Sequence, residues 1–372
     1  MSLLATEILT PRYELAWYPW AVQYFFMIAI SYSALLMTLP GMVFGRERFM
    51  PLARLALLVA VTCTLVGPVA LLADLHQPAR FWHFYANPAP WSWMSIGAFL
   101  LPPYVVLMIL YAYFSWRPAL MEKGHNNQGW DATLARWLCL GSWQTPRLAV
   151  VVTGLLVSVL ALGIMVYTGA EISIIKARPL WNTPWLPVMF VLTGLIAAAG
   201  LVMLLNRLMA GGNHDVNRQG LKVILVSIVA SAVVAAIWLF QGLTGFSPSV
   251  QAALESVRYN PDWAAIAAWA LGAGALLFLS TLMLLRAPAW QRWAWLVGLM
   301  AIHMGWAFRW MVLMEVQTVA KNTAGYYNLV VEAGSYGLMG IIGTFGLWLA
   351  VLLIIDILVP WRDTKHANGT TH

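Results

Sequence analysis

The sequence predicts an all-α integral membrane protein. Of its 372 residues, 61% are hydrophobic and only 9% are charged, whereas a soluble globular protein carries about 25% charged residues. Most of the surface must therefore face lipid, where the backbone can satisfy its hydrogen bonds only in helices or closed barrels. Barrel strands alternate over roughly ten residues. The apolar runs of this chain are long and do not alternate, so we expect helices.

Nine apolar runs are long enough to cross a bilayer, which takes about 20 residues. In chain order, we expect spans at residues 17–40, 51–73, 93–115, 147–170, 187–209, 221–243, 263–285, 289–313 and 336–359. They would form a single polytopic membrane domain over residues 17–359. Short segments at 1–16 and 360–372 would lie outside it, on opposite sides of the membrane.

The connections between the runs are consistent with this assignment. GRERFM (45–50) joins the first two runs and NRLMAGGNHDVNRQG (206–220) joins the fifth and sixth, and both are basic, turn-forming loops. The polar stretch DLHQPARFWHFYANPAPWSWMS (74–95) contains a proline-rich turn that rigidifies the return into the third run. After the third run, WDATLARWLCLGSW (130–143) places Trp and Leu side chains on one helical face, so we expect it to lie flat on the membrane surface.

Lysine and arginine are distributed unequally between the two membrane faces. One face receives fourteen of the 21 Lys and Arg residues, which leaves seven for the other. Because basic loops stay in the cytoplasm, we expect the N-terminus outside and the C-terminus in the cytoplasm. The net charge of +7 is then mainly a topology signal, and we do not expect binding to nucleic acid.

The potential ligands argue against resident metal centres. Cys63 and Cys139 have no partners at a metal-site spacing, so the chain cannot hold an iron–sulfur cluster alone. A membrane haem b normally needs two axial ligands that face each other. Only one of the seven histidines, His303, lies inside an expected span. We therefore expect no haem, no iron–sulfur cluster and no metal site in this chain.

Polar residues gather on the expected outer face. Ionisable groups near hydrocarbon depth are costly, and they usually face a cavity, the bundle interior or a partner. The outer ends of the runs carry Asp74, His76, Arg80, His83, Glu171, Lys176, Arg178, Arg309, Glu315, Gln317 and Lys321, and the first run adds Trp17, Trp20, Gln23 and Tyr24. No chain of carboxylates crosses the membrane, which argues against a proton pump or an ion channel. We expect the chemistry to lie at the outer face.

These residues also have structural explanations. Asp74 and Arg80 could form a salt bridge within the loop, and His76 could cap the second helix. Interfacial positions would account for His83, Tyr24 and Tyr167. Glu171 could pair with another residue of the fold, and His303 could form a hydrogen bond between two helices. A transporter should carry polar sites near the midplane, which is nearly empty of charge here. A purely structural anchor would use the outer polar residues for docking alone.

Two stretches of the chain carry recognisable signatures. Residues 166–200 contain Tyr-x-Gly, Ser, Pro-Leu-Trp-Asn and Leu-Pro, at Tyr167, Gly169, Ser173, Pro179, Leu180, Trp181, Asn182, Leu186 and Pro187. Residues 74–95 contain Asp-Leu-x-x-Pro-x-Arg-Phe-Trp and Ser-Trp-Met-Ser, at Asp74, Leu75, Pro78, Arg80, Phe81, Trp82, Ser92, Trp93, Met94 and Ser95. Both resemble the NrfD-like family of polysulfide-reductase membrane subunits. RWMVLMEVQT (309–318) matches less well, because Glu315 and Val316 stand where a Gly-Gly pair is common. Nine spans resemble the tetrathionate-reductase-like branch.

The resemblance implies a pair of four-helix bundles, with a ninth helix added, in a bacterial inner (cytoplasmic) membrane. It implies a haem-free subunit that oxidises menaquinol or ubiquinol, the quinol being an exchangeable substrate. Its partner would be a ferredoxin-like, four-cluster iron–sulfur subunit on the outer face. That partner would connect to a molybdopterin or multihaem cytochrome catalytic subunit. The same pocket would serve the reverse reaction, quinone reduction, so the sequence leaves the direction of electron flow open.

A quinol site needs an apolar cleft, polar groups for two hydroxyls, and acceptors for two protons. We expect His76 or Asp74 to take the first proton, with Glu171 as a second candidate. Contacts with the quinol are expected from Trp20, Gln23, Tyr24, Tyr167 and His303. In the family, the head group binds between the first and fourth helices, and Tyr167 carries over by its motif. Partner docking or loop structure would use Arg80, Trp82, Arg178 and Lys321.

Overall fold

The computed structural model describes residues 15–126, 128–321 and 326–363. Within those ranges, nine helical segments are long and apolar enough to cross a membrane, which confirms the expected fold class and number of spans. The nine long helices are α1 (Pro19–Thr38), α2 (Met50–Asp74), α4 (Trp93–Asn126), α6 (Arg147–Ser173), α7 (Leu186–Met209), α8 (His214–Leu243), α10 (Pro261–Arg286), α11 (Ala294–Leu313) and α12 (Leu338–Leu358).

Shorter helices connect the spans. They are α3 (His83–Ala86), α5 (Trp130–Leu138) and α9 (Pro248–Tyr259), together with single turns η1 (Leu39–Val43), η2 (Glu47–Phe49), η3 (Pro78–Arg80), η4 (Pro288–Trp293), η5 (Glu315–Thr318) and η6 (Trp361–Asp363). α5 falls in the segment expected at the membrane surface, and Trp130 and Trp137 on it are exposed. α9 lies in a loop where no helix was expected. The third span was expected to end near residue 115, but α4 continues to Asn126.

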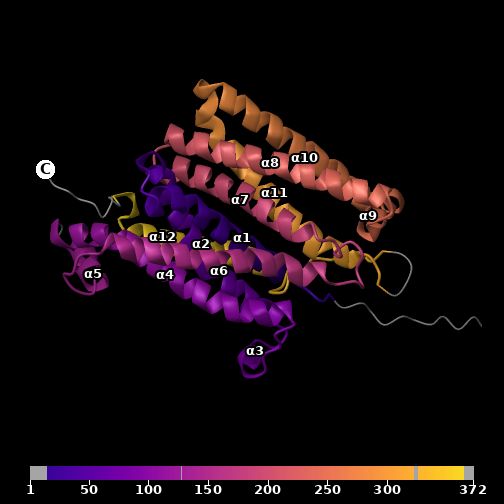
Figure 1. The fold of residues 1–372 in the computed structure, drawn as a ribbon, viewed down its shortest axis with the longest axis horizontal. Helices are drawn as coiled ribbons and strands as arrows, with labels where there is room; N and C mark the ends of the chain where they lie inside the picture. Colours follow the sequence, from indigo (N-terminus) through magenta and orange to yellow (C-terminus); the bar gives the residue numbers. More distant parts are fainter. Residues whose placement is uncertain (1–14, 127, 322–325, 364–372) are drawn as a thin grey trace, which may run out of the picture.

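Eight of the nine spans form two rings of four. α1, α2, α4 and α6 each pack against the next in a closed ring, the first bundle, and α7, α8, α10 and α11 do the same in the second bundle. The bundles meet where α1 packs against α7, and α12 lies against α1 and α2 (Figure 1). This arrangement agrees with the expected pair of four-helix bundles, and α12 is the added helix.

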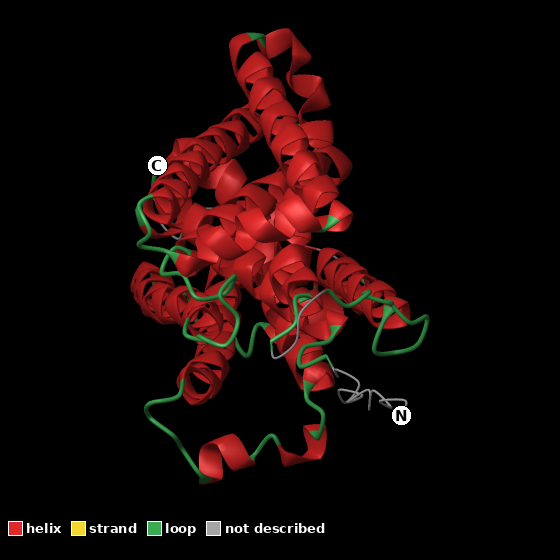
Figure 2. Ribbon diagram, turned by 90° about the vertical axis from the view of Figure 1, so that its right-hand side faces the viewer, coloured by secondary structure: helices red, strands yellow, loops and turns green. Residues whose placement is uncertain are grey.

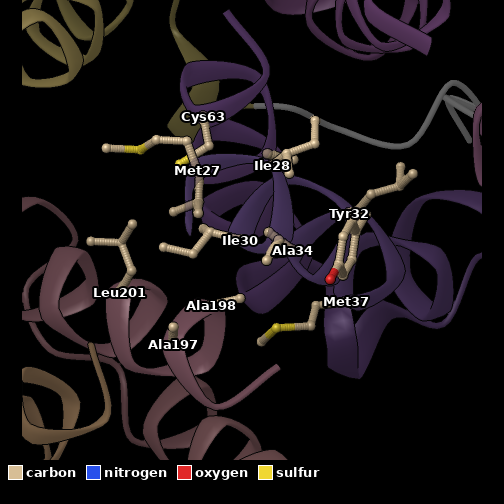
Figure 3. Packing of buried hydrophobic residues seen from close by; sticks show 14 of the residues in the cluster. Met27, Ile28, Ile30, Tyr32, Ala34, Met37, Cys63, Ala197, Ala198 and Leu201 are labelled. Atoms are coloured by element: carbon tan, nitrogen blue, oxygen red, sulfur yellow. The ribbon is translucent and has the colours of Figure 1, made fainter. Parts of the chain in front are cut away.

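The centre of the molecule is the contact between α1 and α7. Nearly every residue of α1 is buried, and small residues such as Ala197 and Ala198 on α7 let the two helices approach closely. Figure 3 shows Ile30 and Ala34 of α1 beside Ala197, Ala198 and Leu201. Because α1 is covered on several sides, its individual side chains are directed toward different neighbours.

We call the end of the membrane domain where α1 begins the N-terminal face. α2 and α6 end there, and α4 begins there, so the polar ends of the first bundle meet at this face. The loop that contains α3 projects beyond the bundle at the same face (Figures 1 and 2). The distribution of basic residues predicts that this face is the outer one.

Candidate functional site

A cavity of about 650 Å³ lies at the N-terminal face of the first bundle. Its lining comes from α1, α2, α3, α4, α6 and the loop that follows α2, and consists of Ala16, Trp17, Tyr24, Thr64, Leu65, Pro68, Leu71, Leu72, Asp74, Leu75, His76, Phe81, Phe84, Tyr85, Met94, Gly97, Ala98, Leu101, Pro102, Val105, Val106, Tyr167 and Glu171. Pockets for small molecules typically measure about 300–1,000 Å³ and combine apolar walls with a few polar groups. This cavity has both properties.

Two tyrosines meet at the cavity wall. The hydroxyl groups of Tyr24 on α1 and Tyr167 on α6 are hydrogen bonded to each other, and both side chains are almost fully buried. The ring of Tyr167 lies directly over Gly97 of α4, where an added Cβ would collide with it. At the end of α6, Gly169 similarly lets the backbone of Pro187 approach. The Tyr-x-Gly part of the motif therefore places the Tyr167 ring at the cavity wall. Its glycine, together with the Leu-Pro part, allows the end of α6 to contact the start of α7.

Glu171 follows Tyr167 by one helical turn, so both side chains lie on the same face of α6 and line the cavity. Its side chain is half-buried. Among the described residues, none donates a hydrogen bond to the Glu171 carboxylate or forms an ion pair with it. Because a carboxylate in apolar surroundings is costly without a partner, this group is suited to receive a hydrogen bond from a bound molecule.

Asp74 has a partner within the fold. One oxygen of this buried carboxylate, Oδ1, accepts a hydrogen bond of 3.1 Å from the backbone N–H of Tyr18, next to the first residue of α1. A negative charge is favourable at the N-terminus of a helix. None of the ion pairs in the described ranges joins Asp74 to Arg80, so the loop salt bridge weighed from the sequence is not formed. Asp74 thus links the end of α2 to the start of α1.

His76 lies at the rim of the cavity. Its side chain is exposed, and its ring centroid is 4.9 Å from that of Tyr18. It also lines the cavity together with Asp74 and Glu171. The structure therefore brings five expected site residues together, namely Tyr24, Asp74, His76, Tyr167 and Glu171.

Two further candidates on α1 are directed away from the cavity. The Gln23 amide donates to the Ile341 carbonyl of α12 over 3.1 Å and accepts a hydrogen bond of 2.9 Å from the indole N–H of Trp306 on α11. The Trp20 ring lies next to Gly340, also on α12. Gln23 therefore connects α1 to α11 and α12, and Trp20 packs against α12.

His303 is not brought to the cavity either. It lies on α11 in the second bundle, is exposed, and packs edge-on against Trp269 of α10 with 5.1 Å between ring centroids. It does not line the cavity of the first bundle. It packs against a neighbouring helix, but among the described residues no hydrogen bond between helices, the structural explanation weighed from the sequence, involves His303.

Arg309 was expected at the outer end of its helix, and it lies one turn before the last residue of α11, Leu313. The residue lies inside α11 and is fully buried. Its guanidinium donates to the carbonyl oxygens of Phe25 at 2.9 Å, Phe190 at 2.9 Å and Gly305 at 2.7 Å, and to the Thr193 hydroxyl at 3.2 Å. Every nitrogen of the side chain has a partner, which is how an intramembrane charge becomes tolerable.

The rest of the 166–200 motif holds the connection between α6 and α7. The Asn182 amide donates to the Ser173 carbonyl over 2.9 Å, and the indole N–H of Trp181 donates to the Val312 carbonyl over 2.6 Å. These bonds tie the loop to the ends of α6 and α11. Trp181 and Asn182 of the motif therefore supply the hydrogen-bond donors that hold this loop in place.

Arg178 has a similar role. It is buried, and it donates to the carbonyl oxygens of Val316 and Val319 over 2.9 Å each. Burial lowers the pKa of its guanidinium to about 10, so the side chain stays charged at neutral pH. Arg178 therefore holds a loop, whereas Arg80 and Trp82 are exposed on the same face.

Sequence reasoning missed several residues in or beside the cavity. Tyr18 binds Asp74 and packs against His76, and Thr64 lines the inner end of the cavity. Gly97 has a detectable signal, because it closely follows the Ser-Trp-Met-Ser motif. Thr64 has none, since a single Thr inside an apolar run is ordinary. Within the described ranges, no three or more His, Cys, Asp and Glu side chains converge as metal ligands would.

The fold and the cavity define a polytopic membrane protein with a mainly apolar cavity near one face. The family model described as "Polysulphide reductase, NrfD" matches residues 9–321, and the chain belongs to this family. The match covers both bundles and stops before α12. The family resemblance inferred from the two motifs is thereby confirmed.

The sequence similarity to one individual protein covers the whole chain, beyond the residues that the family model matches. The chain is 34% identical to a tetrathionate reductase subunit of Salmonella typhimurium over 100% of its own length and 97% of that protein. It is 28% identical to protein NrfD of Escherichia coli, over 62% of this chain and 72% of that one. A selenate reductase subunit of Mesobacillus selenatarsenatis is 24% identical over 54% of this chain and 50% of its own. The full-length match agrees with the tetrathionate-reductase-like branch expected from nine spans.

Proposed function

We propose that this chain is the membrane subunit of a respiratory reductase complex and oxidises a quinol in the cavity of the first bundle. The observation that carries the proposal is the Glu171 carboxylate, which has no partner in the described structure and faces an apolar cavity. The relatives named as tetrathionate and selenate reductase subunits support the membrane-anchor part. The cavity supports the quinol part, because a quinol is an apolar ring with two hydroxyl donors.

The reaction releases two protons and two electrons from the quinol. One hydroxyl group donates a hydrogen bond to Glu171, and its proton passes to that carboxylate as the first electron leaves. Tyr167 lies one turn before Glu171 on α6, and its hydroxyl pair with Tyr24 of α1 can hydrogen bond the ring oxygens. The two electrons leave through the N-terminal face to an iron–sulfur cluster of a partner protein, and the product is the quinone.

The order of proton acceptors follows from their partners. The sequence favoured His76 or Asp74 as first acceptor, but Asp74 is already hydrogen bonded to the start of α1. We therefore assign the first proton to Glu171 and the second to His76. His76 is exposed at the rim, so it is suited to pass protons from the cavity to the aqueous phase. If the N-terminal face is outside, both protons are released outside.

The same face offers a surface for the partner. Arg80, Trp82 and Lys321 are exposed there, and Arg and Trp are enriched at protein interfaces. We propose that they contact a ferredoxin-like, four-cluster iron–sulfur subunit, which passes electrons to a molybdopterin or multihaem cytochrome catalytic subunit. The complex would lie in the bacterial inner membrane.

The test compares Glu171→Gln with wild type in the native complex purified from membranes. The substitution keeps the size of the side chain but removes the proton acceptor, so we expect quinol turnover to fall roughly 100-fold, a typical contribution of one general base. Binding of a fluorescent quinol analogue should weaken much less. Glu255→Gln on the exposed helix α9 is the matched control and should match wild type in both assays.

The outcomes separate this proposal from its alternatives. Unchanged turnover in Glu171→Gln would remove Glu171 from the reaction. A complex that assembles and turns over with other donors, but neither binds nor oxidises a quinol, would make the chain a structural anchor. A complex that only reduces quinone, with the same dependence on Glu171, would keep the site and reverse the direction of electron flow.

A further inference from the structure

A second cavity, of about 560 Å³, lies at the N-terminal face of the second bundle. The start of α10 and the end of α11 form two of its sides, and residues of η5 and of the segment 327–331 complete the lining. It shares no lining residue with the cavity of the first bundle. Neither the quinol reaction nor the loop contacts described above use it, so it is a separate candidate site.

The lining of this second cavity is acidic. It includes Asp262 and Glu315, and none of its described lining residues is Lys, Arg or His. One oxygen of Glu315, Oε1, accepts a hydrogen bond of 2.9 Å from the indole N–H of Trp310. Neither carboxylate forms an ion pair with a described residue. Two carboxylates beside one cavity disfavour each other's charge, and a cation between them favours both charges. The cavity therefore suits a cationic group.

Aromatic side chains indicate which kind of cation fits. Trp263, Trp310 and Tyr327 line the cavity, and Trp310 is stacked on Trp306 with 5.2 Å between ring centroids. An aromatic ring attracts a cation placed over its face. A guanidinium stacks on such rings and also pairs its N–H groups with carboxylates. The volume is large enough for a side chain, so an arginine matches the acidic and the aromatic parts of the lining together.

A buried donor at the same cavity indicates that the occupant also carries an acceptor. Trp263 is only 7% exposed, and its indole N–H has no hydrogen-bond partner among the described residues. Leaving a buried donor unpaired is costly. A polypeptide that brings a guanidinium into the cavity also brings backbone carbonyl groups, which can accept a hydrogen bond from this N–H. A bare metal ion or a simple amine brings no such acceptor.

We propose that this cavity receives an arginine side chain of the partner protein that docks on the N-terminal face. The guanidinium lies between the carboxylates of Asp262 and Glu315, and a backbone carbonyl next to it accepts a hydrogen bond from Trp263. The inference rests on one part of the proposed function, a partner protein at this face, and not on the quinol reaction. It extends the docking surface from the loop of Arg80 and Trp82 to the second bundle.

The test removes the two charges and keeps the size of both side chains. Asp262→Asn is combined with Glu315→Gln, whose amide oxygen can still accept the hydrogen bond from Trp310. The matched control combines Asp215→Asn with Glu255→Gln. Asp215 is the second residue of α8 and follows an asparagine cap, as Asp262 does on α10, and Glu255 is exposed on α9. The native complex is immobilised through this chain, and the release of the partner protein is followed over time.

We expect the dissociation rate constant of the partner to rise at least roughly tenfold in the Asp262→Asn, Glu315→Gln variant, because the loss of a buried charge pair acts mainly on dissociation. The control should match wild type. Asn328→p-benzoylphenylalanine, at an exposed residue of the lining, should cross-link to a partner peptide that contains arginine. Equal dissociation from variant and control, a cross-linked peptide without arginine, or no cross-link to a partner would overturn the proposal.

Failure of the proposed function looks different from failure of this inference. A complex whose partner is held through the second cavity, but which does not oxidise a quinol, would overturn the quinol reaction alone. Equal dissociation from variant and control, with normal quinol oxidation, would overturn this inference alone. A wild-type chain that retains no partner protein would overturn both.

Discussion

Each bundle holds an ionisable side chain inside the membrane domain, and the two side chains have opposite surroundings. Arg309, at the contact between the bundles, gives all of its nitrogens to helix carbonyls and to a hydroxyl of the fold. Glu171 of the first bundle lines a cavity and receives no hydrogen bond from the described residues. Both groups are costly to ionise at this depth, but only Arg309 has hydrogen-bond partners within the described structure.

The comparison indicates how to separate structural from functional charges in a membrane protein. A satisfied charge joins helices, as Arg309 joins α1, α7 and α11. An unsatisfied charge beside a cavity is available to a ligand. Depth and polarity alone do not distinguish the two cases, and the sequence accordingly placed both residues in one group on the outer face.

The largest expected effect on stability comes from Arg309→Met. The carbonyls of Phe25 and Phe190 lose a donor inside the bundle, so the free energy of unfolding should fall by about 2 kcal/mol. Glu171→Gln replaces an ionisable group that has no hydrogen-bond partner in the described structure, so it should not lower the free energy of unfolding. Thermal and SDS unfolding of the purified protein measure both variants side by side. Arg286→Met, at an exposed arginine of α10, is the control. Wild-type stability of Arg309→Met would remove the contrast between the two charges.

Gly97→Ala tests the support of the cavity wall. The new Cβ collides with the ring of Tyr167, which must turn away from Tyr24, so affinity for a quinol analogue should weaken roughly tenfold. Fluorescence quenching by the analogue measures this change. Gly274→Ala makes the same substitution on α10, where no atom lies close enough to clash, and should bind normally. Normal binding by Gly97→Ala would place the quinol away from Tyr167.

Two substitutions of Asp74 distinguish its structural contact with α1 from a role in proton transfer. Asp74→Asn retains an oxygen for the Tyr18 N–H, so stability should be kept and quinol turnover should stay within about threefold of wild type. Asp74→Ala removes that oxygen and should cost about 1 kcal/mol of unfolding free energy, as the loss of a helix cap does. If Asp74→Asn lost as much turnover as Glu171→Gln, the first proton acceptor would be Asp74, as the sequence suggested.

The smallest effect is expected from Tyr24→Phe. It deletes one hydroxyl of the Tyr24–Tyr167 pair and should lower turnover by about threefold, the value of one neutral hydrogen bond. Tyr111→Phe removes a hydroxyl that is bonded to Thr38 at 2.8 Å in the same bundle but does not line the cavity. Its quinol turnover should equal that of wild type. Equal losses in the two variants would show that packing, not the cavity, is responsible.

The number and class of the spans were predictable because they depend on one local property, the length of apolar sequence. The length of apolar sequence did not predict two helices correctly, α4 and α9. α4 continues to Asn126 because helical hydrogen bonding does not stop where the hydrocarbon stops. α9 was missed because it is a short helix of mixed polarity, including Gln251, Glu255 and Arg258, so it has no long apolar run.

The sequence by itself predicted the nine apolar helices found in the described residues, the membership of the NrfD-like family, and a group of polar residues near one face. Only the tertiary structure decided which of those groups share a cavity. Gln23 and Tyr24 are neighbours on α1, but successive residues of a helix point about 100° apart. Packing sets the rotation of α1, and so Tyr24 meets Tyr167 at the cavity, whereas Gln23 meets α11 and α12.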